Sequence, residues 1–188
     1  MPEGTPLQQQ AQKSSWETPR DLFDELWEEA DGFDWDPCCS TDQYTAQRVL
    51  ANNGTICVLD MFGVRDIGGA AVLVDGLAQP WRGKVFMNPP YGLALRKWVP
   101  RAVEMVKNGT AESVWALLPA KTDTQWWQKW VINSVCRVTE VDVFEAAVAG
   151  ADATMDGLAD EVRFLKGRLT FGGAPDPAGF ASVVVVWR

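Results

Sequence analysis

The chain has 188 residues, and 47 % of them are hydrophobic, which is enough for a sizeable core and excludes an intrinsically disordered protein. No apolar run reaches the roughly 18 residues of a membrane-spanning helix, so we predict no contact with a membrane. The net charge of −8 argues against strong non-specific DNA binding, although it allows a local basic face. Residues 1–14 lack the basic and apolar regions of a signal peptide and are predicted to form a flexible tail, and residues 15–188 a single domain.

The cysteine and histidine content excludes several kinds of site. The chain has four cysteines, no Cys-x-x-Cys pair and no histidine, so we predict no Cys/His metal site and no Ser-His-Asp or Cys-His catalytic site. This cysteine pattern fits a reducing compartment and predicts a cytoplasmic protein. Without histidine, the chemistry should need little proton transfer or should use a carboxylate.

The first predicted element is a helix over residues 19–31, where apolar residues recur at helical spacing. Thr18 is its predicted N-cap, Pro19 lies in its first turn, and Gly32 is its predicted stop. Two more helices are predicted over residues 95–109, bent at Pro100, and over residues 122–135. Residues 145–162 read as a peripheral loop or short helix. Strands are predicted within the segments 33–40, 54–63, 70–77, 83–92, 113–120, 136–144, 161–173 and 180–188, the seventh as a strand or hairpin.

The alternation of strands and helices predicts an α/β fold with a mostly parallel sheet covered by helices. In such sheets, ligands bind at the carboxyl ends of the strands. Several polar or proline-containing positions follow predicted strands and should therefore meet at one edge: Asp36-Pro37, Asp60, Asp75, Asn88 to Tyr91 and Pro119.

The segment Met-Asn-Pro-Pro-Tyr-Gly suggests chemistry on an amine. An exocyclic amine of a nucleobase is a weak nucleophile because its lone pair is delocalised into the ring. The Asn88 side-chain oxygen and the Pro89 carbonyl could accept its two N–H bonds and stabilise the developing positive charge. Pro89 and Pro90 stiffen the loop, and the Tyr91 ring can stack on a planar substrate. The alternative is that the two prolines only end a strand.

This segment resembles the catalytic motif of S-adenosylmethionine-dependent amino-methyltransferases. Together with the stretches SWETPRDLFDEL, FDWDPCCS, LLPAKTDTQWW and VRFLKGRLTFGG, it resembles the short, phage-type family of DNA N-6-adenine methyltransferases (Dam). The resemblance implies a seven-stranded Rossmann-like sheet with helices on both faces, and S-adenosylmethionine as cofactor. It also implies transfer of a methyl group to a flipped-out adenine in DNA, a phage or prophage source, the host cytoplasm, and no obligate protein partner.

The resemblance also assigns roles to residues. The catalytic residues would be Asn88, Pro89, Pro90 and Tyr91. The cofactor would be bound by Trp16, Thr18, Pro19, Asp36, Pro37, Cys38 and Asp75. Asp60 is added because its distance from Asp36 is close to the roughly 20 residues that precede a ribose-binding acid in Rossmann folds. The substrate side would include Tyr91, Lys121, Trp126, Arg168 and Phe171.

Two features leave alternatives open. The first cofactor motif of this family usually carries glycines, whereas Cys38 is followed here by Cys39-Ser40-Thr41-Asp42. The local chemistry of Asn-Pro-Pro-Tyr would also serve a methyltransferase acting on guanine N2 in RNA or on glutamine in proteins. A non-catalytic nucleic-acid-binding protein, which would use the ten tryptophans for stacking, is the alternative from another class.

Overall fold

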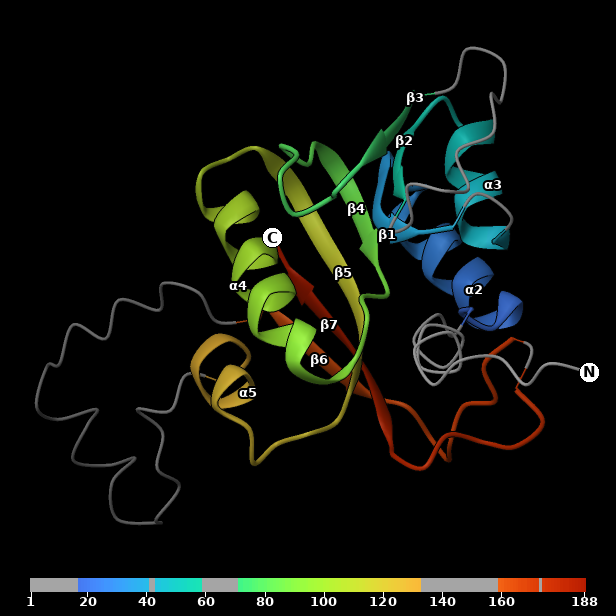
Figure 1. The fold of residues 1–188 in the computed structure, drawn as a ribbon, viewed down its shortest axis with the longest axis vertical. Helices are drawn as coiled ribbons and strands as arrows, with labels where there is room; N and C mark the ends of the chain where they lie inside the picture. The colour runs from blue at the N-terminus through green and yellow to red at the C-terminus, as the bar shows by residue number, and fades with distance from the viewer. Residues whose placement is uncertain (1–16, 41–42, 59–70, 133–158, 173) are drawn as a thin grey trace, which may run out of the picture.

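A seven-stranded sheet in the order β3-β2-β1-β4-β5-β7-β6 forms the centre of the molecule (Figure 1). The computed structural model describes residues 17–40, 43–58, 71–132, 159–172 and 174–188. Their elements are α2 (Arg20–Ala30), β1 (Trp35–Cys39), α3 (Tyr44–Ala51), β2 (Thr55–Val58), β3 (Ala71–Val74), β4 (Gly83–Met87), the 3₁₀ turn η2 (Gly92–Ala94), α4 (Leu95–Lys107), β5 (Ala111–Pro119), α5 (Gln125–Trp130), β6 (Glu161–Phe164) and β7 (Ser182–Trp187).

The sheet is mostly parallel. The strands β3, β2, β1, β4 and β5 pair in parallel, and β7 runs antiparallel between β5 and β6. The chain builds β1, β2 and β3 outward in one direction and then returns to place β4 on the other side of β1. The order therefore reverses between β1 and β4, which is where open α/β sheets bind ligands.

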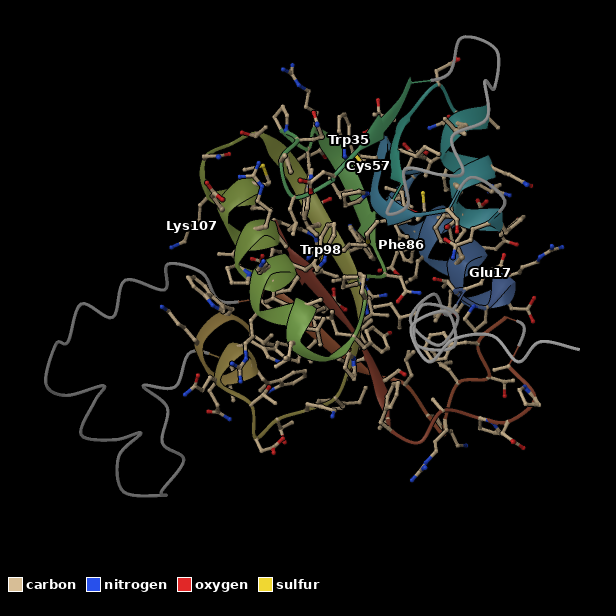
Figure 2. The ribbon with its side chains drawn as sticks, in the orientation of Figure 1. Glu17, Trp35, Cys57, Phe86, Trp98 and Lys107 are labelled. Carbon is tan, nitrogen blue, oxygen red and sulfur yellow. The ribbon has the colours of Figure 1, made fainter. Side chains whose placement is uncertain are left out.

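Two apolar layers cover the two faces of the sheet. Helices α4 and α5 pack on one face, where the core includes Trp81, Trp98 and Trp127, and α2 and α3 lie on the other (Figure 1). Phe86 lies in the second layer and Trp98 in the first, on the α4 side (Figure 2). Because neighbouring residues of a strand point to opposite faces, β4 supplies Val85 and Met87 to the first layer and Phe86 to the second.

Most predicted elements are present, with local differences. Helix α2 ends with Asp31 and Gly32 in left-handed conformations, φ 53° and 82°, as the predicted glycine stop requires. The predicted N-cap is wrong: Pro19 occupies that position, since its carbonyl accepts the Phe23 N–H over 3.0 Å, and the Thr18 hydroxyl accepts a hydrogen bond from Asn88. Among the described residues 161–172 of the next predicted segment, β6 is the strand that forms, and it pairs with β7 and not with a second strand of the same segment. The predicted tail, residues 133–135 of the third predicted helix, the strand 136–144 and most of 145–162 lie outside the described residues.

Candidate active site

The hydrogen-bonded pairing of β1 with its neighbours is interrupted at the reversal of strand order. Beyond the pair Trp35↔Val85, β1 makes no further pairing with β4, and its register with β2 shifts after Asp36. Pro37 has no backbone N–H to donate, which suits a position where the ladder is interrupted. The carboxyl half of β1 and the segment that follows β4 therefore border a break in the ladder.

Asn88 is the first residue after β4, at this break. Its Nδ2 donates a hydrogen bond of 3.0 Å to Oγ1 of Thr18, which is 3 % exposed. This bond turns the oxygen end of the amide away from Thr18. The same loop is tied to β1, since the backbone N–H of Asn88 donates to the sulfur of Cys38. Burial raises the pKa of the Cys38 thiol, so it stays neutral.

Tyr91 is held in place at both ends. Its hydroxyl donates to the Leu117 carbonyl oxygen on β5, over 3.3 Å. Its ring meets Phe171 and Phe180 edge-to-face, with centroids 6.1 and 5.5 Å away. Burial raises the pKa of the hydroxyl, so it remains a neutral donor. The structure therefore brings Phe171 next to Tyr91, both of which were predicted for the substrate side.

Asp36 lies within β1 and not after it, which corrects its predicted position at a strand end. It is 1 % exposed, and Oδ1 accepts the Cys38 N–H over 3.2 Å. Burial raises the pKa of its carboxyl group to about 7, and hydrogen bonds from Cys38 and Thr45 oppose that rise. Asp36 thus shapes the backbone of its own segment, and a direct contact with the cofactor stays a prediction.

Asp75 follows β3 as an exposed residue with a left-handed φ of 53°. The next residue, Gly76, lies so close to β1 that an added Cβ would be 1.9 Å from the Pro37 carbonyl oxygen. This contact keeps the turn after β3 against the carboxyl half of β1. The exposed Asp75 carboxylate is an acceptor of the type needed for the amine or hydroxyls of a nucleoside, so these residues fit the expected cofactor.

Glu17 joins three segments and was missed by sequence reasoning. Its carboxylate accepts the backbone N–H of Tyr44, the first residue of α3, over 3.0 Å. Its carbonyl accepts the Gly172 N–H over 2.9 Å. Glu17 lies near the start of α2 (Figure 2). Glutamate is common on protein surfaces, and the partners of Glu17 are distant in the chain, so the neighbouring sequence does not indicate its role.

The remaining predicted residues differ in their surroundings. Pro19 is the N-cap of α2, and Lys121 is exposed just after β5. Arg168 is exposed, and its Nη1 donates to the Ala178 carbonyl oxygen over 3.4 Å, which braces the segment before β7. Trp126 is 6 % exposed within the core, so nothing around it supports the predicted contact with substrate. Trp16 and Asp60 lie outside the described residues.

A sequence model of the family described as DNA N-6-adenine-methyltransferase (Dam) matches residues 71–179, a span that includes Asn88 to Tyr91 and Phe171. The chain belongs to this family. Membership confirms the predicted family and the prediction of an adenine-specific DNA methyltransferase. A search of curated proteins found no match to the chain.

Solved structures confirm the fold of this Dam-family chain. The 23S rRNA methyltransferase ErmE is similar, with a TM-score of 0.52 and 14 % identity over 93 % of this chain and 70 % of that one. A putative RNA methyltransferase, PH1948 from Pyrococcus horikoshii, gives 0.51 and 14 % over 91 % and 84 %. At such low identity the likeness shows the fold alone, the predicted Rossmann-like methyltransferase sheet. Membership of the Dam family implies the use of S-adenosylmethionine.

Membrane-spanning helices and metal-binding groups were both sought among the described residues of this Dam-family chain. No helix within the described ranges is long and apolar enough to cross a membrane. Among the same described residues, His, Cys, Asp and Glu form no group that could hold a metal ion.

Proposed function

We propose that the chain transfers a methyl group from S-adenosylmethionine to N6 of an adenine in DNA. The observation that carries the proposal is the Asn88 amide, fixed by the buried Thr18 hydroxyl at the break in the ladder. The acceptor is a flipped-out base, because the exocyclic amine of a paired and stacked adenine cannot reach such a site.

The proposed chemistry uses oriented acceptors. S-adenosylmethionine would supply a methyl group made electrophilic by its sulfonium. As N6 forms the new bond to the methyl carbon, the carbon–sulfur bond would break, S-adenosylhomocysteine would leave, and N6 would lose its extra proton to water. With Nδ2 of Asn88 bound to Thr18, Oδ1 is the end of the amide that accepts one N–H of the target amine. The Pro89 carbonyl accepts the other N–H. Both dipoles stabilise the positive charge that grows on N6 during attack, and the proline pair keeps them in place beforehand.

Tyr91 would hold the flipped base by stacking. Its hydroxyl bond to Leu117 and its edge-to-face contacts with Phe171 and Phe180 fix the plane of the ring before substrate arrives. A fixed ring loses less conformational entropy when a base stacks on it. On the cofactor side we propose Pro37, Cys38 and Asp75, which border the break in the ladder between β1 and β4 or the adjoining turn after β3.

The charge distribution supports a nucleic-acid acceptor. The segment from Gly76 to Val103, which contains Asn88 to Tyr91, has no Asp or Glu in a chain with 25 acidic residues. It carries five cations: Arg82, Lys84, Arg96, Lys97 and Arg101. Lys84 is paired with Asp31 and Arg101 with Glu104, so the exposed Arg96 and Lys97, in the first turn of α4 after the motif, are the cations best placed to attract phosphates.

The test uses labelled S-adenosylmethionine with separate samples of unmethylated DNA, RNA and protein, and identifies the methylated species by mass. We expect N6-methyladenine in DNA. Label in RNA or protein alone would refute the proposed acceptor. Asn88→Ala should keep the fold and the binding of cofactor but lose most of the activity. Asn52→Ala, which removes an exposed amide at the end of α3, is the matched control and should be unaffected.

A further inference from the structure

Leu93 is an exposed apolar side chain beside the proposed catalytic loop. Within the described residues, three large hydrophobic side chains are exposed: Leu93 at 77 %, Phe164 at 65 % and Ile132 at 39 %. Single exposed leucines are common on protein surfaces, so exposure alone carries no meaning. The position and neighbours of Leu93 distinguish it.

Leu93 has no packing role in its own element. The buried face of α4 begins with Leu95, which is 1 % exposed, and continues through Trp98 and Val99. Two residues earlier is about half a helical turn, so Leu93 lies on the side away from that face. It belongs to η2, which follows Tyr91 directly and begins with Gly92 at φ 88°. The chain thus presents Leu93 outward at the turn that leaves the motif.

The location places Leu93 near the proposed acceptor base. It is two residues after Tyr91, so the two Cα atoms are separated by no more than about 7 Å. Arg96 and Lys97, both exposed, follow in the first turn of α4, which contains no acidic residue. An apolar side chain with cations beside it is better suited to bind DNA, where it can contact base faces while the cations contact phosphates, than to bind an apolar protein surface.

We propose that Leu93 enters the DNA duplex and fills the gap that the flipped adenine leaves. A flipped base costs a few kcal/mol of stacking and pairing, and it leaves apolar base faces exposed to water. Apolar side chains such as Leu insert between base steps in other DNA-binding proteins. Leu93 covers the exposed faces and holds the base out of the stack. This inference rests on the proposed function, because it requires duplex DNA as the substrate.

The experiment compares kcat/KM on unmethylated duplex DNA with kcat/KM on the same DNA made single-stranded. Leu93→Ala should lower the duplex value at least about tenfold, equivalent to about 1.4 kcal/mol, and change the single-strand value less than about twofold. Single strands need no gap to be filled. Leu93→Met keeps an apolar side chain of similar size and should retain the duplex rate. Phe164→Ala truncates another exposed apolar residue, on β6, and is the control expected to change neither value.

Each outcome has one meaning for Leu93. Equal losses on duplex and single-stranded DNA, or no loss on either, would overturn the role of Leu93 and leave the proposed function intact. If the unmodified protein methylates single-stranded DNA but not duplex DNA, the role of Leu93 is also overturned and the proposed function is also left intact. If that protein methylates neither form of DNA, the proposed function fails and the inference fails with it. Since Leu93 is 77 % exposed, truncation should leave the thermal midpoint unchanged, which separates the effect from misfolding.

Discussion

Removing the Thr18 hydroxyl should lower the rate of methyl transfer without weakening cofactor binding. Thr18→Val keeps the shape of the side chain and deletes the acceptor of the 3.0 Å hydrogen bond from Asn88. Thr18 is 3 % exposed, so water cannot easily take the place of the hydroxyl. A buried donor without a partner costs about 1–3 kcal/mol.

In Thr18→Val, the side-chain amide of Asn88 can recover part of the lost hydrogen-bond energy by rotating so that Nδ2 finds another acceptor. Rotation would direct Nδ2 of Asn88 toward the target amine, where two donors would face each other. If about 1–3 kcal/mol of orientation is lost in the transition state, kcat should fall by about 5- to 150-fold, at about 1.4 kcal/mol per tenfold change. Thr18→Ser keeps the hydroxyl and should retain most of the rate.

Two measurements separate this role from the predicted contact of Thr18 with the cofactor. Single-turnover methylation gives the rate of transfer, and calorimetry gives the dissociation constant for S-adenosylmethionine. We expect Thr18→Val to lose rate at an unchanged dissociation constant. A raised dissociation constant with an unchanged transfer rate would refute the reasoning, because it would assign the hydroxyl to the cofactor and not to Asn88.

Two more predictions concern the surroundings of β1. Asp36→Asn should alter the pH dependence of stability. In the unmodified protein the pKa of Asp36 is raised to about 7 by folding, so the free energy of unfolding should decrease as pH rises from about 4 to 7, by up to about 4 kcal/mol. The stability of Asp36→Asn relative to the unmodified protein, from urea unfolding, should therefore increase over that range and level off above it; a difference independent of pH would contradict this. Gly76→Ala should lower the thermal midpoint and weaken cofactor binding, because the added Cβ would lie 1.9 Å from the Pro37 carbonyl oxygen. Gly179→Ala is the control: its added Cβ meets nothing within 4 Å, so neither property should change.

The features that the sequence predicted correctly have local signals. The strands are short apolar runs ending in polar residues or prolines, so the sequence alone places Asp75 and Asn88 at the carboxyl edge of the sheet. Helix α4 is recognisable from its apolar spacing and from Asn108-Gly109 at its end, where Gly109 has φ 71°. Patterns of this kind depend only on neighbours in the chain.

The missed features depend on residues that are distant in the chain. Helix α3 is absent from the predicted elements, because its eight residues have only a short buried stripe and its first N–H is satisfied by the Glu17 side chain. Thr18 has the residue type of an N-cap, and only the folded sheet shows that Asn88 engages its hydroxyl. Asp36 looks like a strand-end ligand, yet the register of β1 buries it.

The acid-free segment from Gly76 to Val103 has a consequence for how the molecule meets DNA. All 25 acidic residues lie elsewhere, so most of the chain repels a polyanion while the exposed Arg96 and Lys97 of this segment attract it. Encounters should therefore be oriented, with unproductive approaches rejected before contact. Added salt screens the repulsion as well as the attraction, so the rate of association should fall less steeply with ionic strength than it does for a uniformly basic DNA-binding protein.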